Sequence, residues 1–181
     1  MGASTEHIQD ELVKRCLQGD RDAFFRLYKQ YSRSMYNVGY RIVRDEAEAE
    51  DVLQEAFISA FRNLSRYRGD ATFGAWLKRI VVNKAINAVN KRRTERFPEN
   101  RQIDVIEESE EIMDFPFTVE KVKHAIEQLP DGYRMVLSLY LLEGYDHGEI
   151  AEILGISEST SKSQFNRSKK KLKEILLNIE E

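Results

Sequence analysis

The sequence has little of several residue types, and each shortage excludes a class of protein. Cys16 is the one cysteine, so an internal disulfide is excluded. Only His7, His124 and His147 accompany it, whereas a structural zinc site needs about four such ligands. The longest apolar stretch, around residues 135–142, is too short and interrupted to cross a bilayer, and the N-terminus has no secretory apolar core. We therefore expect a cytoplasmic protein without membrane insertion and without a cofactor or metal.

Proline, glycine and alternating patterns are also scarce. The chain has three prolines and nine glycines, and no segment sustains the period of two that a half-buried strand shows, which predicts an all-α protein. Helical periodicity fails over residues 97–118, where Pro98 and Pro116 bracket a run of acidic residues. The sequence therefore predicts two small helical domains, residues 9–96 and 119–178, joined by a flexible acidic linker.

Local signals place several helix boundaries. Apolar residues at steps of three and four predict a helix over residues 22–43, and Asp45 is expected to cap the next helix. A further helix is predicted to begin at Phe73. In the second domain, residues 130–132 (Pro-Asp-Gly) are predicted to form a turn before a helix over residues 133–142.

Residues 145–167 have the plan of a helix-turn-helix. The first helix ends at Leu154, Gly155 supplies the left-handed turn residue, and Ser157 is a candidate N-cap for the second helix. The N-terminal half of this second helix, which meets base edges and phosphates in such motifs, carries Thr160, Lys162, Ser163, Gln164 and Arg167. The alternative is a basic, solvated C-terminal helix, because such patterns also arise by accident.

The net charge of −3 conceals a segregation of charge. Residues 61–96 hold 10 basic and 2 acidic side chains, whereas residues 97–131 hold 3 basic and 10 acidic ones. Opposite charges on separate surfaces allow one chain to bridge DNA and a basic protein partner. The basic side chains of residues 61–96 are interleaved with Phe61, Tyr67, Phe73 and Trp76. Cations beside aromatic rings that stack on bases are typical of proteins that bind an opened strand.

Core packing is the alternative interpretation for Phe73 and Trp76, because an aromatic residue at helical spacing is usually buried. Tyr67 lies in a polar segment between Arg66 and Arg68, so it is the better candidate for stacking on a base.

Taken in order, these motifs resemble one family. The run Ala49-Glu50-Asp51-Val52-Leu53-Gln54-Glu55-Ala56-Phe57 and the segment Tyr67-Arg68-Gly69-Asp70 are similar to region two of the extracytoplasmic-function (ECF) RNA polymerase sigma factors, the RpoE-like members of the sigma-70 family. Leu129-Pro130 and the helix-turn-helix are similar to region four, and the resemblance covers about residues 9–177. It implies a non-enzymatic alternative sigma factor that binds core RNA polymerase and directs recognition of the −10 and −35 promoter elements, DNA melting and transcription initiation.

The resemblance also implies partners and roles for particular side chains. Asp51, Gln54 and Glu55 match the surface that docks on the β′ coiled coil of polymerase, although a solvated helix face would also explain them. The residues that match the −10-binding surface are Tyr67, Arg68, Trp76, Lys78, Arg79, Asn83, Lys84 and Asn87. Thr160, Lys162, Ser163, Gln164 and Arg167 match the −35-binding helix. The family further implies contact with the β flap, and restraint by an anti-sigma factor.

Two positions depart from the family's pattern. An apolar residue is usual where this chain has Ser161, so a serine on the buried side is expected to weaken packing. Arginine is frequent where this chain has Gln164, and the amide of glutamine pairs with adenine whereas arginine pairs with guanine. The preferred −35 sequence is therefore expected to differ from that of relatives.

Two other functions fit parts of the sequence. A helix-turn-helix regulator that acts without joining polymerase would explain the second domain and leave the basic, aromatic block unexplained. An enzyme fits less well, because the sequence has no Gly-rich phosphate loop, no metal-ligand spacing and no pairing of a nucleophile with a base.

Overall fold

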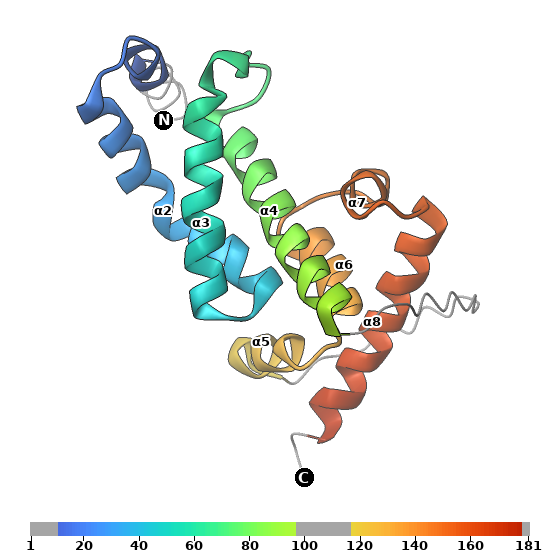
Figure 1. Cartoon of the computed structure of the whole chain (residues 1–181). Coiled ribbons are helices and arrows are strands. Elements are labelled where there is room, and N and C mark those ends of the chain that lie inside the picture. The colour runs from blue at the N-terminus through green and yellow to red at the C-terminus, as the bar shows by residue number, and fades with distance from the viewer. Residues whose placement is uncertain (1–10, 97–116, 179–181) are drawn as a thin grey trace. The chain divides into compact units, whose positions relative to one another are not determined.

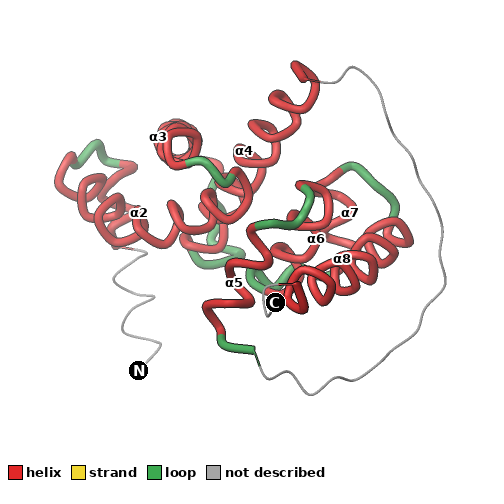
Figure 2. The backbone as a smooth tube through the Cα atoms, turned by 90° about the horizontal axis from the view of Figure 1, so that it is seen from below, coloured by secondary structure: helices red, strands yellow, loops and turns green. Residues whose placement is uncertain are grey.

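The computed structural model describes residues 11–96 and 117–178, and every regular element in these ranges is a helix (Figures 1 and 2). Residues 11–17 are helical, and the elements that follow are α2 (Arg21–Val43), α3 (Glu46–Arg62), the 3₁₀ helix η1 (Leu64–Arg66), α4 (Phe73–Arg96), α5 (Val119–Glu127), α6 (Asp131–Leu141), α7 (His147–Leu154) and α8 (Glu158–Asn178). The predicted all-α class is confirmed. The chain divides into two compact units, Met1–Arg92 and Arg93–Glu181. Residues 97–116 of the predicted linker lie outside the described residues.

The N-terminal unit is built around α2, α3 and α4. Helices α2 and α3 are joined by only two residues, Arg44 and Asp45, and they lie side by side (Figure 1). Gly39 lies at their contact, because a Cβ atom at this position would lie 3.4 Å from a methyl group of Val52. The core between the helices consists of side chains with almost no exposure, among them Leu27, Ile42, Phe57, Leu77, Val81 and Val89.

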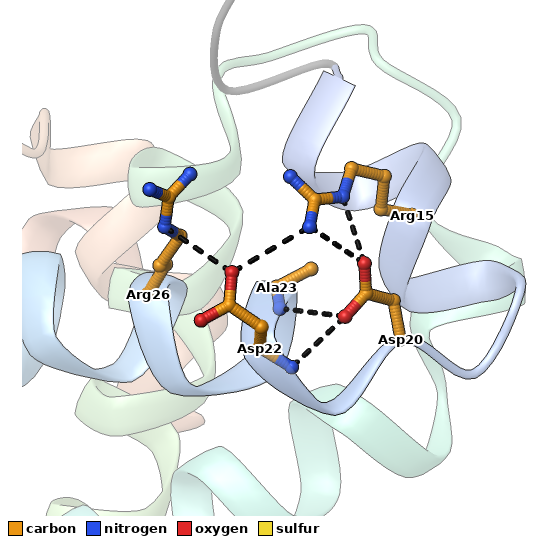
Figure 3. Close-up of polar contacts among 5 residues, drawn as sticks. All are labelled: Arg15, Asp20, Asp22, Ala23 and Arg26. Carbon is orange, nitrogen blue, oxygen red and sulfur yellow. Dashed lines mark hydrogen bonds and ion pairs between the residues drawn. The ribbon is translucent and has the colours of Figure 1, made fainter.

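Short polar contacts fix where α2 begins (Figure 3). The Asp20 carboxylate caps the helix by accepting hydrogen bonds from the backbone amides of Asp22, at 2.9 Å, and Ala23, at 3.3 Å. Arg15 donates from Nε to Asp20 at 2.8 Å and also pairs with Asp22, which in turn pairs with Arg26. The hydrogen bond from Arg15 lowers the pKa of Asp20 below its ordinary value. These contacts tie residues 11–17 to the start of α2.

The opposite end of the N-terminal unit is also held by polar groups. Asp45 caps α3 as predicted, because its Oδ1 accepts from the amide of Glu48 at 2.9 Å. Arg92, near the end of α4, donates to the Val43 carbonyl oxygen at 3.3 Å and to Glu48 at 3.0 Å. One guanidinium therefore connects α4 to the end of α2 and the start of α3.

In the C-terminal unit, α8 packs against α5, α6 and α7 around buried Val136, Leu139, Ile150 and Leu176. The predicted turn over residues 130–132 is wrong, because α6 already begins at Asp131.

Two interactions explain this early start of α6. A carboxylate in the first turn is favoured by the helix dipole, and Asp131 also pairs with the buried guanidinium of Arg134. Arg134 donates in addition to the carbonyl oxygen of Leu129 at 2.9 Å, which links α6 to the chain just after α5. Within the described residues, no helix is both long and apolar enough to span a membrane.

Candidate nucleic-acid interface

Helix α4 brings four of the eight predicted −10 contacts onto one face. Trp76, Arg79, Asn83 and Asn87 follow one another at steps of three and four residues, which places them on the same side of a helix. Arg79, Asn83 and Asn87 are exposed, and Trp76 is half-buried. Lys78 is separated from them, because five residues of helix place it about 140° around the axis from Asn83. The structure therefore places four of the eight predicted residues on this face of α4, whereas Lys84 lies about 100° and Lys78 about 140° around the axis from Asn83.

Tyr67 and Trp76 form a partly exposed aromatic pair at the start of this face. Their ring centroids are 5.4 Å apart, and both rings rest on Phe73, at 5.9 Å from Tyr67 and 5.8 Å from Trp76. Phe73 is 1% exposed, so the core interpretation holds for this residue, whereas Tyr67 and Trp76 are only half-buried. The two outer rings can therefore offer an edge or face to a base while Phe73 supports them from below.

The loop between Tyr67 and Phe73 is solvent-exposed and locally fixed. The Tyr67 hydroxyl donates to the carbonyl oxygen of Ala71 at 2.6 Å, and Gly69 takes a φ of 79° that other residues rarely adopt. Thr72 Oγ1 accepts from the amide of Ala75 at 3.2 Å, which caps the first turn of α4. Arg68 is exposed in this closed loop, so its guanidinium is accessible to a phosphate.

On α3, the three predicted polymerase contacts share an exposed face. Asp51, Gln54 and Glu55 are exposed at steps of three and four residues. Lys84, a predicted DNA contact on α4, lies with its Nζ 3.0 Å from Glu55 Oε2. Ile58 was not among the predicted site residues, yet it is 51% exposed one turn after Glu55. Ile58 follows Gln54 by four residues and Glu55 by three, so helical spacing could have placed this apolar side chain on the same surface.

The helix-turn-helix is present, with the predicted cap and turn residues. Gly155 has a φ of 64° in the left-handed region, and Ser157 Oγ accepts from the amide of Thr160 at 3.0 Å, as expected of an N-cap. The first helix begins with a capping box, which the sequence did not predict. Asp146 accepts from the amide of Glu149 at 2.8 Å, and the Glu149 carboxylate accepts from the amide of Asp146 at 3.0 Å.

The predicted −35 contacts on α8 fall on two sides of the helix. Thr160, Ser163, Gln164 and Arg167 share one side by their spacing, and all four are half-buried. Lys162 lies about 160° from Gln164 around the axis, where it is exposed and pairs with Glu158 at 2.8 Å. The first four therefore form a single edge, and Lys162 belongs to a different one.

Two side chains of this edge have notable surroundings. Gln164 lies beside the first turn of α6, because a Cβ atom on Gly132 would be 3.8 Å from its Oε1. Arg167 keeps one buried guanidinium nitrogen, Nη2, that has no hydrogen-bond partner among the described residues. A buried donor without a partner costs free energy.

Ser161 is completely buried, as its place on the helix predicted. Its hydroxyl lies 2.9 Å from Nδ1 of His147, the first residue of α7. Burial, and secondarily the charge of Lys162, lower the pKa of His147 below its ordinary value, so the neutral imidazole is favoured. Ser161, which stands where the family usually has an apolar residue, therefore has a polar partner, His147, on the neighbouring helix.

No group of three or more His, Cys, Asp or Glu side chains could hold a metal ion within residues 11–96 and 117–178. The described surfaces instead present amides, guanidinium groups and aromatic rings on α4, and hydroxyl, amide and basic groups on α8. These are the groups that read base edges, stack on bases and contact phosphates.

Comparisons with known proteins point in the same direction. A family model described as Sigma-70 region 2 matches residues 27–95, and one described as Sigma-70, region 4 matches residues 120–172. The chain is 32% identical over 184 residues to the RNA polymerase sigma-H factor of Pseudomonas aeruginosa, covering 95% of each protein. It is 33% identical over 178 residues to the ECF RNA polymerase sigma-E factor of Escherichia coli, covering 91% of this chain and 93% of that one.

Two solved structures resemble the fold. One is the sigma factor RpoE in complex with the anti-sigma factor NepR from Bartonella quintana, with a TM-score of 0.58 and 20% identity over 85% of this chain and 96% of that chain. The other is CnrH in complex with the cytosolic domain of CnrY, with a TM-score of 0.57 and 24% identity over 94% of this chain and 97% of that chain. At these identities the likeness concerns the fold alone.

Proposed function

We propose how each surface of this chain acts in transcription initiation, because the chain belongs to the extracytoplasmic-function group of the sigma-70 family of RNA polymerase sigma factors. It is an alternative sigma factor that directs transcription initiation. In our proposal, residues 9–96 bind core polymerase and the −10 element, residues 119–178 bind the −35 element, and residues 97–118 link the two. The protein acts in the cytoplasm, without a cofactor and without covalent chemistry of its own.

The observation that supports the −10 role is the exposed amide and guanidinium face of α4 beside the Tyr67–Trp76 pair. Asn83 and Asn87 carry both a donor and an acceptor, which is what a base edge requires. Unstacking a base costs a few kcal/mol, and stacking on an aromatic ring returns about 1–3 kcal/mol per base. A few bases held by these rings and amides are therefore enough to favour the melted strand.

The observation that supports the −35 role is the edge formed by Thr160, Ser163, Gln164 and Arg167 in the second helix of the helix-turn-helix. Gln164 suits adenine through a bidentate amide pair. Lys162 points away from that edge, so we assign it to a phosphate, a contact that positions the helix without reading sequence.

The surface of Asp51, Gln54 and Glu55 is our candidate for binding the β′ coiled coil of core polymerase, and the C-terminal unit for binding the β flap. Exposed carboxylates on a packed helix suit a basic protein surface. RpoE and CnrH, whose folds this chain shares, were solved as complexes with NepR and with CnrY. We accordingly propose that an anti-sigma factor restrains this protein as well.

Transcription by purified core polymerase from a promoter library, with and without the full-length protein, tests the proposal. We expect start sites that depend on the protein and share −10 and −35 sequences. The Asp51→Ala, Glu55→Ala double variant should lose these starts through weaker binding to core polymerase. Glu46→Ala, which removes an exposed carboxylate from the first turn of the same helix, about 140° around the axis from Asp51, should keep them. Absence of protein-dependent starts, with tight duplex binding in the absence of polymerase, would favour a helix-turn-helix regulator.

The proposed −10 role of α4 is tested by comparing two neighbouring substitutions. Arg79→Ala removes a cation from the proposed DNA face, and Lys78→Ala removes one from the neighbouring position that points elsewhere. We expect Arg79→Ala to weaken open-complex formation more than Lys78→Ala does, measured with permanganate on unpaired thymines. Equal losses would mean that bulk charge, and not this face, binds the strand.

A further inference from the structure

A polar contact connects the two helices of the helix-turn-helix. His147 Nδ1, at the start of α7, lies 2.9 Å from the hydroxyl oxygen of Ser161, in the first turns of α8. The imidazole is stacked on Tyr140, with centroids 4.6 Å apart and an interplanar angle of 18°, and it meets the edge of Phe165 at 5.5 Å. Tyr140 and Phe165 are also 4.6 Å apart. The three rings come from α6, α7 and α8 and pack against one another.

The hydroxyl of Ser161 restricts how α8 can be rotated about its own axis. Ser161 has no exposed surface, and a buried hydroxyl that loses its partner is destabilising. An apolar side chain at this position would tolerate a range of rotations, because apolar packing has no direction. A hydrogen bond weakens steeply when its length or angle changes. The rotation of α8 that keeps the Ser161 hydroxyl within hydrogen-bonding distance of His147 is therefore favoured over slightly different rotations.

That rotation decides which side chains of α8 face outward. Thr160 precedes Ser161 directly, and Gln164 follows it by about one turn. A change of rotation moves both side chains together, because all three belong to the same rigid helix. Base recognition by a bidentate amide requires placement of its atoms within a fraction of an ångström.

We propose that His147 is a positioning residue, which fixes the rotation of α8 through Ser161 and thereby sets the base preference at the −35 element. This inference rests on the proposed reading of the −35 element by α8. The charged groups around the imidazole are Asp146, the N-cap of α7, and Glu158 and Lys162 on α8. His147 acts through Ser161 and need not touch DNA itself.

Three substitutions separate the hydrogen bond from the stacking. His147→Phe keeps an aromatic ring in contact with Tyr140 and Phe165 and removes Nδ1. His147→Asn places an amide near the position of Nδ1 and removes most of the ring. Ser161→Ala removes the hydroxyl from the other side and suits a helix. Ser168→Ala is the matched control, because Ser168 is equally buried on α8, seven residues later, and donates to the Phe165 carbonyl of its own helix at 2.7 Å.

The experiment uses full-length variants with core polymerase and a library of −35 sequences in front of a fixed −10 element. The readout is the ratio of transcription from the preferred base to that from each other base at every position. We expect His147→Phe and Ser161→Ala to reduce this ratio about two- to tenfold at the same positions, as loss of one hydrogen bond implies. The double variant should be no worse than either single variant. His147→Asn should retain more of the wild-type ratio than His147→Phe does. Ser168→Ala should leave the ratio unchanged.

Other results would overturn the inference. If the wild-type protein shows no −35 preference, reading by α8 fails and the inference fails with it. If the wild-type preference is clear and Ser161→Ala preserves it, the positioning role alone is overturned. A uniform fall in transcription from all promoters with Ser161→Ala would likewise assign the pair to stability and not to specificity.

Discussion

Glu55 Oε2 on α3 lies 3.0 Å from Lys84 Nζ on α4, so a proposed polymerase contact is paired with a proposed DNA contact. Both side chains are partly exposed, 63% for Glu55 and 36% for Lys84, and an ion pair in such a setting is weak. A weak pair is easily exchanged for other partners. Polymerase that takes up Glu55 would therefore leave the ammonium group of Lys84 to a phosphate.

This relationship predicts opposite effects of one substitution. Glu55→Gln should weaken binding to core polymerase and should strengthen, about two- to fivefold, binding of the free protein to a single-stranded −10 oligonucleotide, because Lys84 loses its counter-ion. Fluorescence anisotropy with a labelled oligonucleotide measures the second effect. Glu50→Gln removes the same charge from α3 outside the pair and serves as the control. Equal gains for both variants would mean that net charge, and not the pair, restrains Lys84.

Two glycines inside helices should respond to alanine with opposite signs. A Cβ atom on Gly74, in the first turn of α4, would lie 2.7 Å from Cε1 of Tyr31, whose ring packs on Phe73. Gly74→Ala should therefore destabilise the N-terminal unit by about 1–3 kcal/mol through overpacking. A Cβ atom on Gly132 meets nothing closer than 3.8 Å, so Gly132→Ala should stabilise α6 by about 0.5–1 kcal/mol through helix propensity.

Urea unfolding followed by circular dichroism measures both changes. Each variant is the other's control, because both replace a helical glycine by alanine. If Gly74→Ala were as stable as the wild-type protein, the ring of Tyr31 would have to be free to move away from α4.

Much of the fold could be predicted because it depends on neighbours in the sequence. The helix over residues 22–43, the caps at Asp45 and Ser157 and the turn at Gly155 rest on periodicity and on side chains that contact their own backbone. The prediction of a turn over residues 130–132 was wrong because it, too, relied on local sequence alone. Proline, aspartate and glycine suit both a turn and a helix start, and the pairing of Asp131 with Arg134 favoured the helix.

The sequence predicted which residues form the candidate site better than it predicted how these residues are arranged in space. Periodicity shows which side chains share a face, and it would have separated Lys78 and Lys162 from their neighbours. It does not show which faces of different helices meet. The Glu55–Lys84 pair joins residues 29 positions apart, and the His147–Ser161 pair joins residues 14 positions apart. Such contacts depend on how helices pack in three dimensions, for which the sequence offers no local signal.

Cys16 should be chemically unreactive in the folded protein. Its side chain is 3% exposed, and burial raises the pKa of the thiol to about 11, with a further contribution from the nearby carboxylate of Asp20. At pH 8 about one thiol in a thousand is then ionised, and the thiolate is the reactive form. We expect reaction with an aromatic disulfide reagent to be at least about a hundredfold slower than in denaturant. Comparable rates would mean that the helix over residues 11–17 opens readily.

The stability of the C-terminal unit should decrease in mild acid because of His147. Burial lowers the pKa of this imidazole in the folded protein below the ordinary value of 6.5, so the unfolded chain binds the proton more readily. The stabilising contribution of the neutral ring is therefore complete above pH 6.5 and is lost as the pH falls through the folded-state value. Asp146 and Glu158 oppose the shift and Lys162 reinforces it, but burial is the largest cause.

Thermal unfolding of the wild-type protein and His147→Phe between about pH 7.5 and pH 5 measures this contribution. The wild-type midpoint should fall over this range by more than the midpoint of His147→Phe, because phenylalanine cannot take up a proton. His124 lies in the same unit on α5, where it is 65% exposed and beside Glu127, so His124→Phe should keep the pH dependence of the wild-type protein. If His147→Phe lost stability in acid as steeply as the wild-type protein does, the dependence would have to come from groups other than His147. The half-buried imidazole would then contribute to the helix-turn-helix through its hydrogen bond and stacking alone.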